Sequence, residues 1–503
     1  MDELTPLSLA NLHALPAEIA VPRYDRTDLA PGIVHIGLGN FHRAHQAWYL
    51  HRLMQAGRAQ DWAIIGAGVR AYDAAMRGKL LAQDCLTTLV ELDPSSTAAE
   101  VTGSMIDYLP ITAGNRPLIS QMVDPAIRIV SLTVTEGGYY RRNMAFDAEH
   151  PDIQADVAGP DTPGTAFGAI VSALKHRRQL GAAPFTVLSC DNLQNNGDIL
   201  RDTVVSLARL SDPDLADWID SQCSFPNSMV DCIVPATGEG ERALVASLGI
   251  ADQVPVTHEA FRHWVIEDDF CAGRPPWEEV GAILTDDVHR FEAMKLRILN
   301  GGHQILANAA ELLSVATISE AAQHPLISAM FEKVERDEIL PFVKEVPGFT
   351  PTAYFSLIRK RFENPKIVDT TRRVAFDGSS RHAGFVVPSI RDGLAADRSV
   401  EGLALVEALW ARYCLGSRED GTRIEPNDPV WSHLTARAQA AQNDPNAWLQ
   451  MADIYGETGH DPDFAHAFAR HFERLQRDGV VETIRAYLNP AEVSQSRSHS
   501  GSV

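Results

Sequence analysis

Residues 32–39 read GIVHIGLG, a β-branched apolar run that ends in two glycines one residue apart. Residues 41–54 follow with aromatic and leucine side chains at helical spacing. Further apolar runs also end in glycine or polar residues, at 62–65, 127–134 and 185–188. A helical pattern at 165–181 separates the last two runs. Strands and helices that alternate in this way predict a parallel α/β sheet.

The glycine-rich turn after the first run is a partial dinucleotide-binding motif. Gly37 would allow a tight turn and Gly39 would let a pyrophosphate approach the backbone, but His42 replaces the usual third glycine. Arg43 would either face cofactor phosphates or pack at the helix end, and the sequence leaves both readings open. The candidate cofactor-binding residues of this segment are Gly37, Gly39, Asn40, Phe41, His42 and Arg43.

The end of the second strand usually supplies an acid that binds the adenosine ribose. Residues 67–70 contain no acid, but Asp73 follows closely and would reach the 2′-hydroxyl. Arg70 would instead suit a 2′-phosphate, and Asp73 also fits a helix cap or a solvated charge. The pattern favours NAD over NADP.

Length and composition set the broad class. At 503 residues, two or three domains are expected. The net charge of −22 speaks against a nucleic-acid surface. The N-terminus lacks a signal pattern and no apolar run approaches the ~20 residues of a membrane helix. We therefore expect a cytoplasmic monomer that acts on a small molecule, with no nucleic-acid or membrane partner.

From about residue 286 onward the pattern becomes mainly helical. The long helical patterns cover 292–316, 325–344, 400–416, 464–477 and 480–488. The serine-rich segment 494–503 is typical of a disordered tail. We predict an α/β domain at 1–285, a mainly α-helical domain at 286–493 and a disordered tail.

The helical domain opens with a chemically unusual trio, Lys295, Asn300 and His303. Alcohol oxidation without a metal needs a base, an amide that holds the developing oxyanion and a group that orients the substrate. On a straight α-helix Asn300 and His303 would lie about 140° and 80° around from Lys295, with an axial spread of about 12 Å. Gly301 and Gly302 cost roughly 1 kcal/mol each in a helix, so close approach of substrate or backbone is expected there. A surface lysine, a capping asparagine and a core histidine remain the alternative.

Two further observations bear on this trio. Asn192 follows the fourth strand and would supply a second amide donor, although it also fits a turn. The sequence has no Tyr-x-x-x-Lys pair and no HExxH or CxxC site. His42 and His45 lack an accompanying acid or cysteine cluster, so no metal is expected. Lys295 is then the best available base, because a desolvated lysine can lose its proton near neutral pH.

The motifs resemble those of the polyol-specific long-chain dehydrogenases, the mannitol dehydrogenase family. The similarity covers nearly the whole chain apart from the tail, and the Lys-x4-Asn-x2-His spacing is specific. The matching stretches are IGLGNFHRAHQ (36–46), TEGGY (135–139), SCDNL (189–193), FPNSMVD (225–231), TDDV (285–288), KLRILNGGH (295–303) and DGSS (377–380).

The resemblance implies an N-terminal Rossmann-type domain, a mainly α-helical C-terminal domain and an active site between them. It implies a metal-independent, NAD-dependent interconversion of D-mannitol and D-fructose, with Lys295 as general base and Asn192 and Asn300 as the oxyanion site. His303 would orient the substrate, and Glu292 would serve proton passage. The implied substrate-pocket residues are Asp231, Arg373 and Arg381.

Some positions depart from the family pattern. Tyr72 precedes Asp73 where the family shows a Glu-Asp pair, which leaves NADP use open. Cys232 stands where arginine is common, and some members have lysine at the position of Arg381. Related substrates such as D-arabinitol or a hexuronate, as in fructuronate and tagaturonate reductases, remain alternatives, and a uronate would need an extra cation. A non-catalytic nucleotide-binding sensor is the alternative from another class.

Overall fold

The computed structural model describes residues 4–142 and 145–489. It divides into two compact units, of which the first ends at His289 and the second begins at Arg290. The tail predicted at 494–503 lies outside the described residues.

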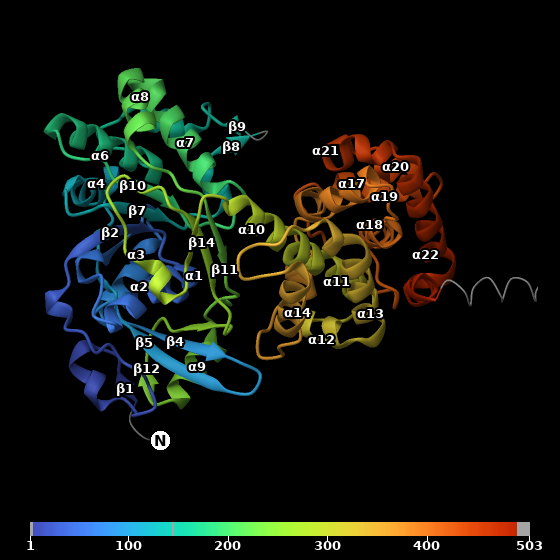
Figure 1. Cartoon of the computed structure of the whole chain (residues 1–503), viewed down its shortest axis with the longest axis horizontal. Coiled ribbons are helices and arrows are strands. Elements are labelled where there is room, and N and C mark those ends of the chain that lie inside the picture. Colours follow the sequence, from blue (N-terminus) through green and yellow to red (C-terminus); the bar gives the residue numbers. More distant parts are fainter. Residues whose placement is uncertain (1–3, 143–144, 490–503) are drawn as a thin grey trace, which may run out of the picture. The chain divides into compact units, whose positions relative to one another are not determined.

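The centre of the first unit is a five-stranded sheet in the order β10-β7-β2-β3-β6, in which all neighbouring strands run parallel. Its strands are β2 (Pro31–Ile36), β3 (Ala63–Ala67), β6 (Met105–Tyr108), β7 (Ile129–Leu132) and β10 (Thr186–Ser189). This confirms the predicted parallel α/β sheet (Figure 1). The strand order reverses between β2 and β7, and ligands of such sheets bind beyond the strand ends at that point.

The helices around this sheet are more numerous than the two that the sequence predicted, at 41–54 and 165–181, of which the second is confirmed. They include α1 (Asn40–Ala44), α2 (Gln46–Gln55), α3 (Asp73–Leu81), α4 (Arg116–Val123), α5 (Pro151–Ala158), α6 (Ala166–Leu180), α7 (Asn196–Ser211), α8 (Pro213–Gln222) and α9 (Glu239–Ser247). The single helix expected at 41–54 is wrong, because the chain breaks at His45 (φ −119°, ψ −90°). The buried His45 ring there shares a hydrogen bond of 3.1 Å with the carbonyl of His263.

Two small sheets of the first unit escaped the sequence analysis. One has the order β13-β4-β5 and the other β11-β14-β15. Their strands are β4 (Thr87–Leu92), β5 (Thr97–Thr102), β11 (Ser228–Asp231), β13 (Val256–His258), β14 (His263–Glu267) and β15 (Ile283–Thr285). The strand β11 ends at Asp231 and thereby positions this predicted substrate-pocket residue.

The second unit is helical, as predicted. Its principal elements are α10 (Val288–Met294), α11 (Gly301–Leu312), α12 (Ile318–Gln323), α13 (Pro325–Val334), α14 (Pro351–Phe362), α15 (Thr371–Val374), α16 (Gly378–Arg381), α17 (Val387–Ala395), α18 (Glu401–Tyr413), α19 (Trp431–Ala441) and α22 (Pro462–Leu488). The last of these breaks at Gly479 (φ 81°), which agrees with the two helices predicted at 464–477 and 480–488. Within the described chain, no helix combines the length and the apolar character needed to cross a membrane.

Within the described residues of the second unit, three segments are π-helical: η7 (Lys295–Asn300), η8 (Glu335–Ile339) and η10 (His382–Val386). The segment η7 contacts both η8 and η10. π-Turns within α-helices are rare and frequently mark functional sites. The sequence trio thus begins on one of these segments.

Candidate active site

The π-turn changes the geometry expected for Lys295 and Asn300. On a straight α-helix, residues five apart would lie about 140° from each other. A π-turn pairs residue i with residue i+5, so Lys295 and Asn300 are instead about one turn apart on the same side. The expectation of a straight helix is therefore wrong. Lys295 is buried and Asn300 is half-buried, which separates them from ordinary solvated side chains.

Close packing accounts for the two glycines that follow Asn300. A Cβ atom on Gly301 would lie 3.4 Å from the carbonyl oxygen of Phe385 in η10. A Cβ atom on Gly302 would lie 2.8 Å from the ring of Phe331 and 3.1 Å from Oε1 of Glu335. Glycine at these positions lets α11 approach its neighbours, which offsets its low helix propensity.

His303 is half-buried in the second unit, against an aromatic ring. Its ring stacks on Phe362 with centroids 4.3 Å apart. Burial lowers the pKa of His303 to about 3, so the imidazole is neutral. The carboxylate of Asp369 opposes this pKa shift, whereas the nearby guanidinium groups of Arg373 and Arg381 reinforce it. The structure therefore brings His303, Arg373 and Arg381 together.

The ring nitrogen Nε2 of His303 is available to a ligand. It is buried and has no hydrogen-bond partner among the described residues. A neutral imidazole can donate or accept one hydrogen bond at this atom. Such a group suits the orientation of a hydroxyl or carbonyl oxygen.

The remaining predicted residues of the second unit have clear local positions. Arg373 donates two hydrogen bonds to Asp369, from Nε at 2.6 Å and Nη2 at 2.5 Å. Arg381 donates from Nη1 to the carbonyl of Val374 at 2.8 Å. Glu292 is buried on α10, one turn before Lys295.

Asn192 and Asp231 belong to the first unit, whereas the trio belongs to the second. Asn192 is exposed and lies three residues beyond β10. Asp231 is buried and pairs in register with His263 of β14. Asn192 therefore follows a strand of the parallel sheet, as expected for a ligand-binding residue of an α/β fold. Asp231 is instead the last residue of β11, in one of the small sheets.

The two glycines after β2 have different tasks. Gly37 has φ +96°, and a Cβ atom there would lie 2.1 Å from the carbonyl oxygen of Thr133. Gly39 has an ordinary extended φ of −83°, and a Cβ atom there would have no neighbour within 4 Å. Gly37 thus lets the turn pass close to the end of β7, while Gly39 leaves open space above the backbone at the switch point of the sheet. That open space fits the approach of a cofactor pyrophosphate.

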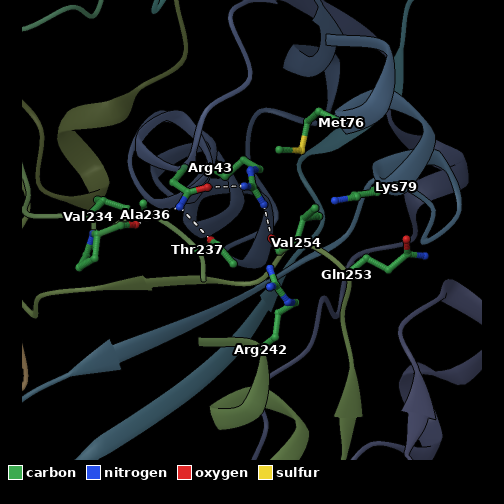
Figure 2. A pocket seen from close by; sticks show the side chains of 11 residues that line it. Arg43, Met76, Lys79, Val234, Ala236, Thr237, Arg242, Gln253 and Val254 are labelled. Atoms are coloured by element: carbon green, nitrogen blue, oxygen red, sulfur yellow. Dashed lines mark hydrogen bonds between the residues drawn. The ribbon is translucent and has the colours of Figure 1, made fainter. Parts of the chain in front are cut away.

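The Arg43 side chain lies beside Val254, within the first unit (Figure 2). The Arg43 guanidinium donates to the carbonyls of Gly39 and Val254 and to Oδ1 of Asn40. Nδ2 of Asn40 donates to Thr237 Oγ1 at 2.8 Å and also to a backbone carbonyl. For Arg43 the structure therefore favours packing at the helix end over the reading in which it faces cofactor phosphates.

The neighbouring aromatic side chains are also packed internally. Phe41 stacks on His45, and His42 stacks on His35 with ring centroids 3.4 Å apart. A cavity of about 420 Å³ borders this segment, and the exposed Lys79 and Arg242 help to line it. Asn40 and Arg43 also line this cavity, so part of the predicted cofactor segment borders open space.

Asp73 is the first residue of α3, and Oδ2 of its carboxylate accepts the backbone N–H of Arg70 at 3.0 Å. A Cβ atom on Gly68 would lie 2.5 Å from this oxygen, so glycine there lets the carboxylate approach the end of β3. The Arg70 guanidinium donates to the hydroxyl of Tyr140 at 3.0 Å and to Asp152 at 3.5 Å. Arg70, the cation that would suit a 2′-phosphate, is thus already hydrogen-bonded within the protein. Asp73 places a carboxylate at the end of β3.

Sequence reasoning missed the residues that shape the switch point. Asp191 accepts the backbone N–H groups of Val134 and Thr135 and the hydroxyl of Tyr139. It thereby joins the segments that follow β7 and β10. Its place in the SCDNL motif was a signal, because a carboxylate directly after a buried strand often caps neighbouring backbone N–H groups. Across residues 4–142 and 145–489 we find no cluster of three or more His, Cys, Asp or Glu side chains arranged to hold a metal.

Comparison with protein families separates the two halves of the chain in a similar way. Residues 31–279 match the family model of the mannitol dehydrogenase Rossmann domain, and residues 287–476 match that of the mannitol dehydrogenase C-terminal domain. The chain belongs to the mannitol dehydrogenase family. This confirms the resemblance drawn from the sequence motifs, and with it the expected combination of a Rossmann-type domain and a mainly helical domain.

Several known dehydrogenases are similar to this chain over nearly their full lengths. The mannitol 2-dehydrogenase of Cereibacter sphaeroides is 53% identical and covers 93% of this chain and 98% of its own. A solved ternary complex of Pseudomonas fluorescens mannitol 2-dehydrogenase with NAD and D-mannitol is 39% identical, with a TM-score of 0.84, and covers 96% of this chain and 99% of its own. A substrate-free D-sorbitol dehydrogenase is 33% identical, with a TM-score of 0.88, and covers 95% of this chain and 100% of its own.

Proposed function

We propose that this chain is an NAD-dependent polyol dehydrogenase that interconverts D-mannitol and D-fructose. The observation that carries the proposal is the 53% identity to a mannitol 2-dehydrogenase across 93% of the chain. The similarity to a mannitol 2-dehydrogenase solved with NAD and D-mannitol supports the same cofactor and substrate. The first unit would bind the cofactor, and the second would carry the base.

Within this function, Lys295 takes the proton from the C2 hydroxyl of the polyol. When bound, the nicotinamide supplies the hydride acceptor. The amides of Asn300 and Asn192 donate hydrogen bonds to the oxygen as it changes from hydroxyl to carbonyl. The buried Nε2 of His303 orients the same substrate, since a neutral imidazole can bind a hydroxyl without adding charge.

The other predicted residues have supporting roles in the proposal. Glu292, one turn before Lys295, would pass the proton onward. Asp231, Arg373 and Arg381 would hold the outer hydroxyl groups of the polyol chain. The carboxylate of Asp369 fixes the Arg373 guanidinium through two hydrogen bonds, which limits its movement.

Asp73 would select NAD by accepting hydrogen bonds from the adenosine ribose and by repelling a 2′-phosphate. The family has a Glu-Asp pair where this chain has Tyr72 and Asp73, so one acid must act alone. The open space above Gly39 would receive the pyrophosphate.

Replacing Asp73 with Asn should weaken the preference for NAD. We expect kcat/KM with NAD to fall about tenfold, since a hydrogen bond to a charged group contributes roughly 1.5–3 kcal/mol. The ratio of kcat/KM for NADP to that for NAD should rise at the same time, because a repulsive charge is removed. Steady-state assays with both cofactors measure this, and Asp161→Asn at an exposed position provides the control. An unchanged ratio would show that Asp73 does not set the preference.

The D-sorbitol dehydrogenase similarity favours D-sorbitol as a second candidate substrate. D-Mannitol and D-sorbitol differ only in configuration at C2, and both give D-fructose when oxidised there. An assay panel of D-mannitol, D-sorbitol, D-arabinitol and hexuronates with NAD and NADP separates the possibilities. We expect the highest kcat/KM for D-mannitol with NAD. A higher value for another member would replace the substrate in the proposal, and NAD binding with no turnover would support a sensor.

A further inference from the structure

A cavity of about 670 Å³ lies in the second unit, lined by residues of α13, η8, α18 and α22. Figure 1 shows the helices α13, α18 and α22 in this unit, and α22 packs against both of the others. The lining contains none of the residues with predicted roles in polyol oxidation. The cavity is therefore a separate feature that the proposed function does not use.

The lining of the cavity has more basic than acidic residues. The basic residues are Lys333, Arg336, Arg398, Arg470 and Arg474. The acidic residues are Asp337, Glu338 and Glu401. The chain as a whole has a net charge of −22, so this local excess of positive charge runs against the general composition. A concave surface with such an excess attracts anions.

The acidic side chains are already engaged within the fold. Glu338 accepts the backbone N–H groups of Gly402 and Leu403, at 2.6 and 2.8 Å, and thereby caps α18. Burial raises the pKa of Glu338 to about 7, which further reduces its negative charge near neutral pH. Glu401 pairs with Arg470 and with Nε2 of His471.

Two arginines retain capacity for a ligand. Arg398 is exposed and makes no side-chain hydrogen bond or ion pair with any other residue that the structure describes. Arg474 pairs through Nε with Asp478, at 3.3 Å, and shares this carboxylate with Arg477. The neighbouring basic side chains are already paired, Arg336 with Glu332 and Lys333 with Asp337, so Arg398 and Arg474 carry the capacity for an anion.

The chemistry of the lining points to a ligand with two different ends. Guanidinium groups match the geometry of phosphate oxygens. Oδ2 of Asp337 already accepts a hydrogen bond from Lys333 at 2.7 Å, but its second oxygen and the Ser399 hydroxyl can accept hydrogen bonds from neutral hydroxyl groups. The Asp337 carboxylate would repel a ligand that is anionic throughout. The buried ring of Tyr487 and the side chain of Pro341 supply an apolar wall for a carbon chain. The Tyr487 hydroxyl has no hydrogen-bond partner among the described residues.

We propose that this cavity binds a phosphorylated sugar or sugar alcohol, with its phosphate held by arginines that include Arg398 and Arg474. The volume lies within the range of about 300–1,000 Å³ for small-molecule sites and exceeds what inorganic phosphate alone requires.

The position of η8 connects the cavity to the candidate active site. This segment lines the cavity through Asp337 and Glu338 and also carries Glu335. Glu335 is fully buried, and its Oε1 lies close to Gly302, the residue before His303. The segment η8 also contacts η7, which carries Lys295. Occupancy of the cavity is therefore expected to alter turnover, an expectation that rests on the proposed function.

Calorimetry on the full chain tests the binding site without reference to activity. Glucose 6-phosphate is the probe, with glucose and inorganic phosphate as comparisons. We expect glucose 6-phosphate to bind at least tenfold more tightly than either. Arg398→Ala and Arg474→Ala should each weaken binding about tenfold through loss of charged hydrogen bonds. Arg423→Ala, at an exposed arginine outside the cavity lining, should not.

The outcomes separate the parts of the proposal. Absence of glucose 6-phosphate binding, or equal affinity in the double variant Arg398→Ala/Arg474→Ala, would overturn the site. Inorganic phosphate bound as tightly as the sugar phosphate would overturn the ligand class and leave an anion site only. Thermal unfolding of each variant verifies that the fold is retained.

Kinetics test the connection to turnover. With saturating glucose 6-phosphate we expect kcat for D-mannitol oxidation to change at least twofold in the wild type but not in the double variant. An unchanged wild-type kcat would overturn the connection while calorimetry still decides the binding site. If no polyol is oxidised at all, the proposed function fails, and the binding result stands independently.

Discussion

Lys295→Ala should lower kcat for D-mannitol oxidation by about 10³-fold, within the 10²–10⁴-fold range of general acid–base catalysis. The buried lysine shares one side of a π-turn with Asn300, so its amine would meet the same oxygen that the amide holds. Removing it leaves no positioned group to take the hydroxyl proton. NAD affinity, measured by fluorescence titration, should change less than about threefold because the predicted cofactor segment lies in the first unit.

Two further variants sharpen this test. Lys295→Arg keeps the positive charge, but a guanidinium does not lose its proton near neutral pH, so turnover should stay low. Lys344→Ala removes an exposed lysine of the same unit and should leave kcat unchanged. Turnover of Lys295→Ala near the wild-type level would rule out the lysine as the base.

The sequence predicted the central sheet because each strand has a strong local signal. The runs at 32–36 and 185–188 are apolar, β-branched or aromatic, and end in residues typical of turns. The strands β4 and β13 were not predicted, although they pair with each other in parallel. Their pairing joins residues about 170 positions apart in the chain, and a local pattern carries no information on such a partner.

The π-turn at Lys295 could not be read from residue types. The segment has the apolar spacing of an α-helix. A π-turn differs from an α-helix only in that each backbone hydrogen bond spans five residues instead of four. Next to the π-turn, α11 packs closely against its neighbours. Gly301 lies against the Phe385 carbonyl of η10, and Gly302 lies against Phe331. The sequence indicated close approach at these glycines but could not name the neighbours.

The cofactor segment shows the same limit at the level of side chains. The sequence left two readings for Arg43, and the hydrogen bond to Val254 that favours one of them joins residues more than two hundred positions apart. Asn40 is likewise held by the distant Thr237. A polar residue at the start of a helix is equally consistent with ligand binding and with packing until its partners are known. The tight turn itself, in contrast, was predicted correctly from the sequence. Position 37 has a positive φ that favours glycine, and the residue there is glycine.

Gly37→Ala and Gly39→Ala should therefore affect different properties, although each adds one methyl group to the same turn. The first should lower stability and the second should lower NAD affinity. Alanine at 37 must adopt φ near +96° and would meet the Thr133 carbonyl at 2.1 Å. We expect a loss of about 3 kcal/mol from backbone strain and overpacking, with a fall in Tm of roughly 6–12 °C.

Alanine at 39 has an ordinary φ and no atom within 4 Å of its methyl group, so the free energy of unfolding should change by less than about 0.5 kcal/mol. The methyl group would instead occupy the space that a cofactor pyrophosphate needs, and NAD affinity should fall at least about tenfold. Thermal unfolding and NAD titration of both variants measure the two effects separately. Unchanged NAD affinity in Gly39→Ala would show that the cofactor does not approach this turn. An alanine at position 37 can avoid the Thr133 carbonyl only if the end of β7 moves. An unchanged Tm in Gly37→Ala would therefore show that this movement costs no stability, against the prediction.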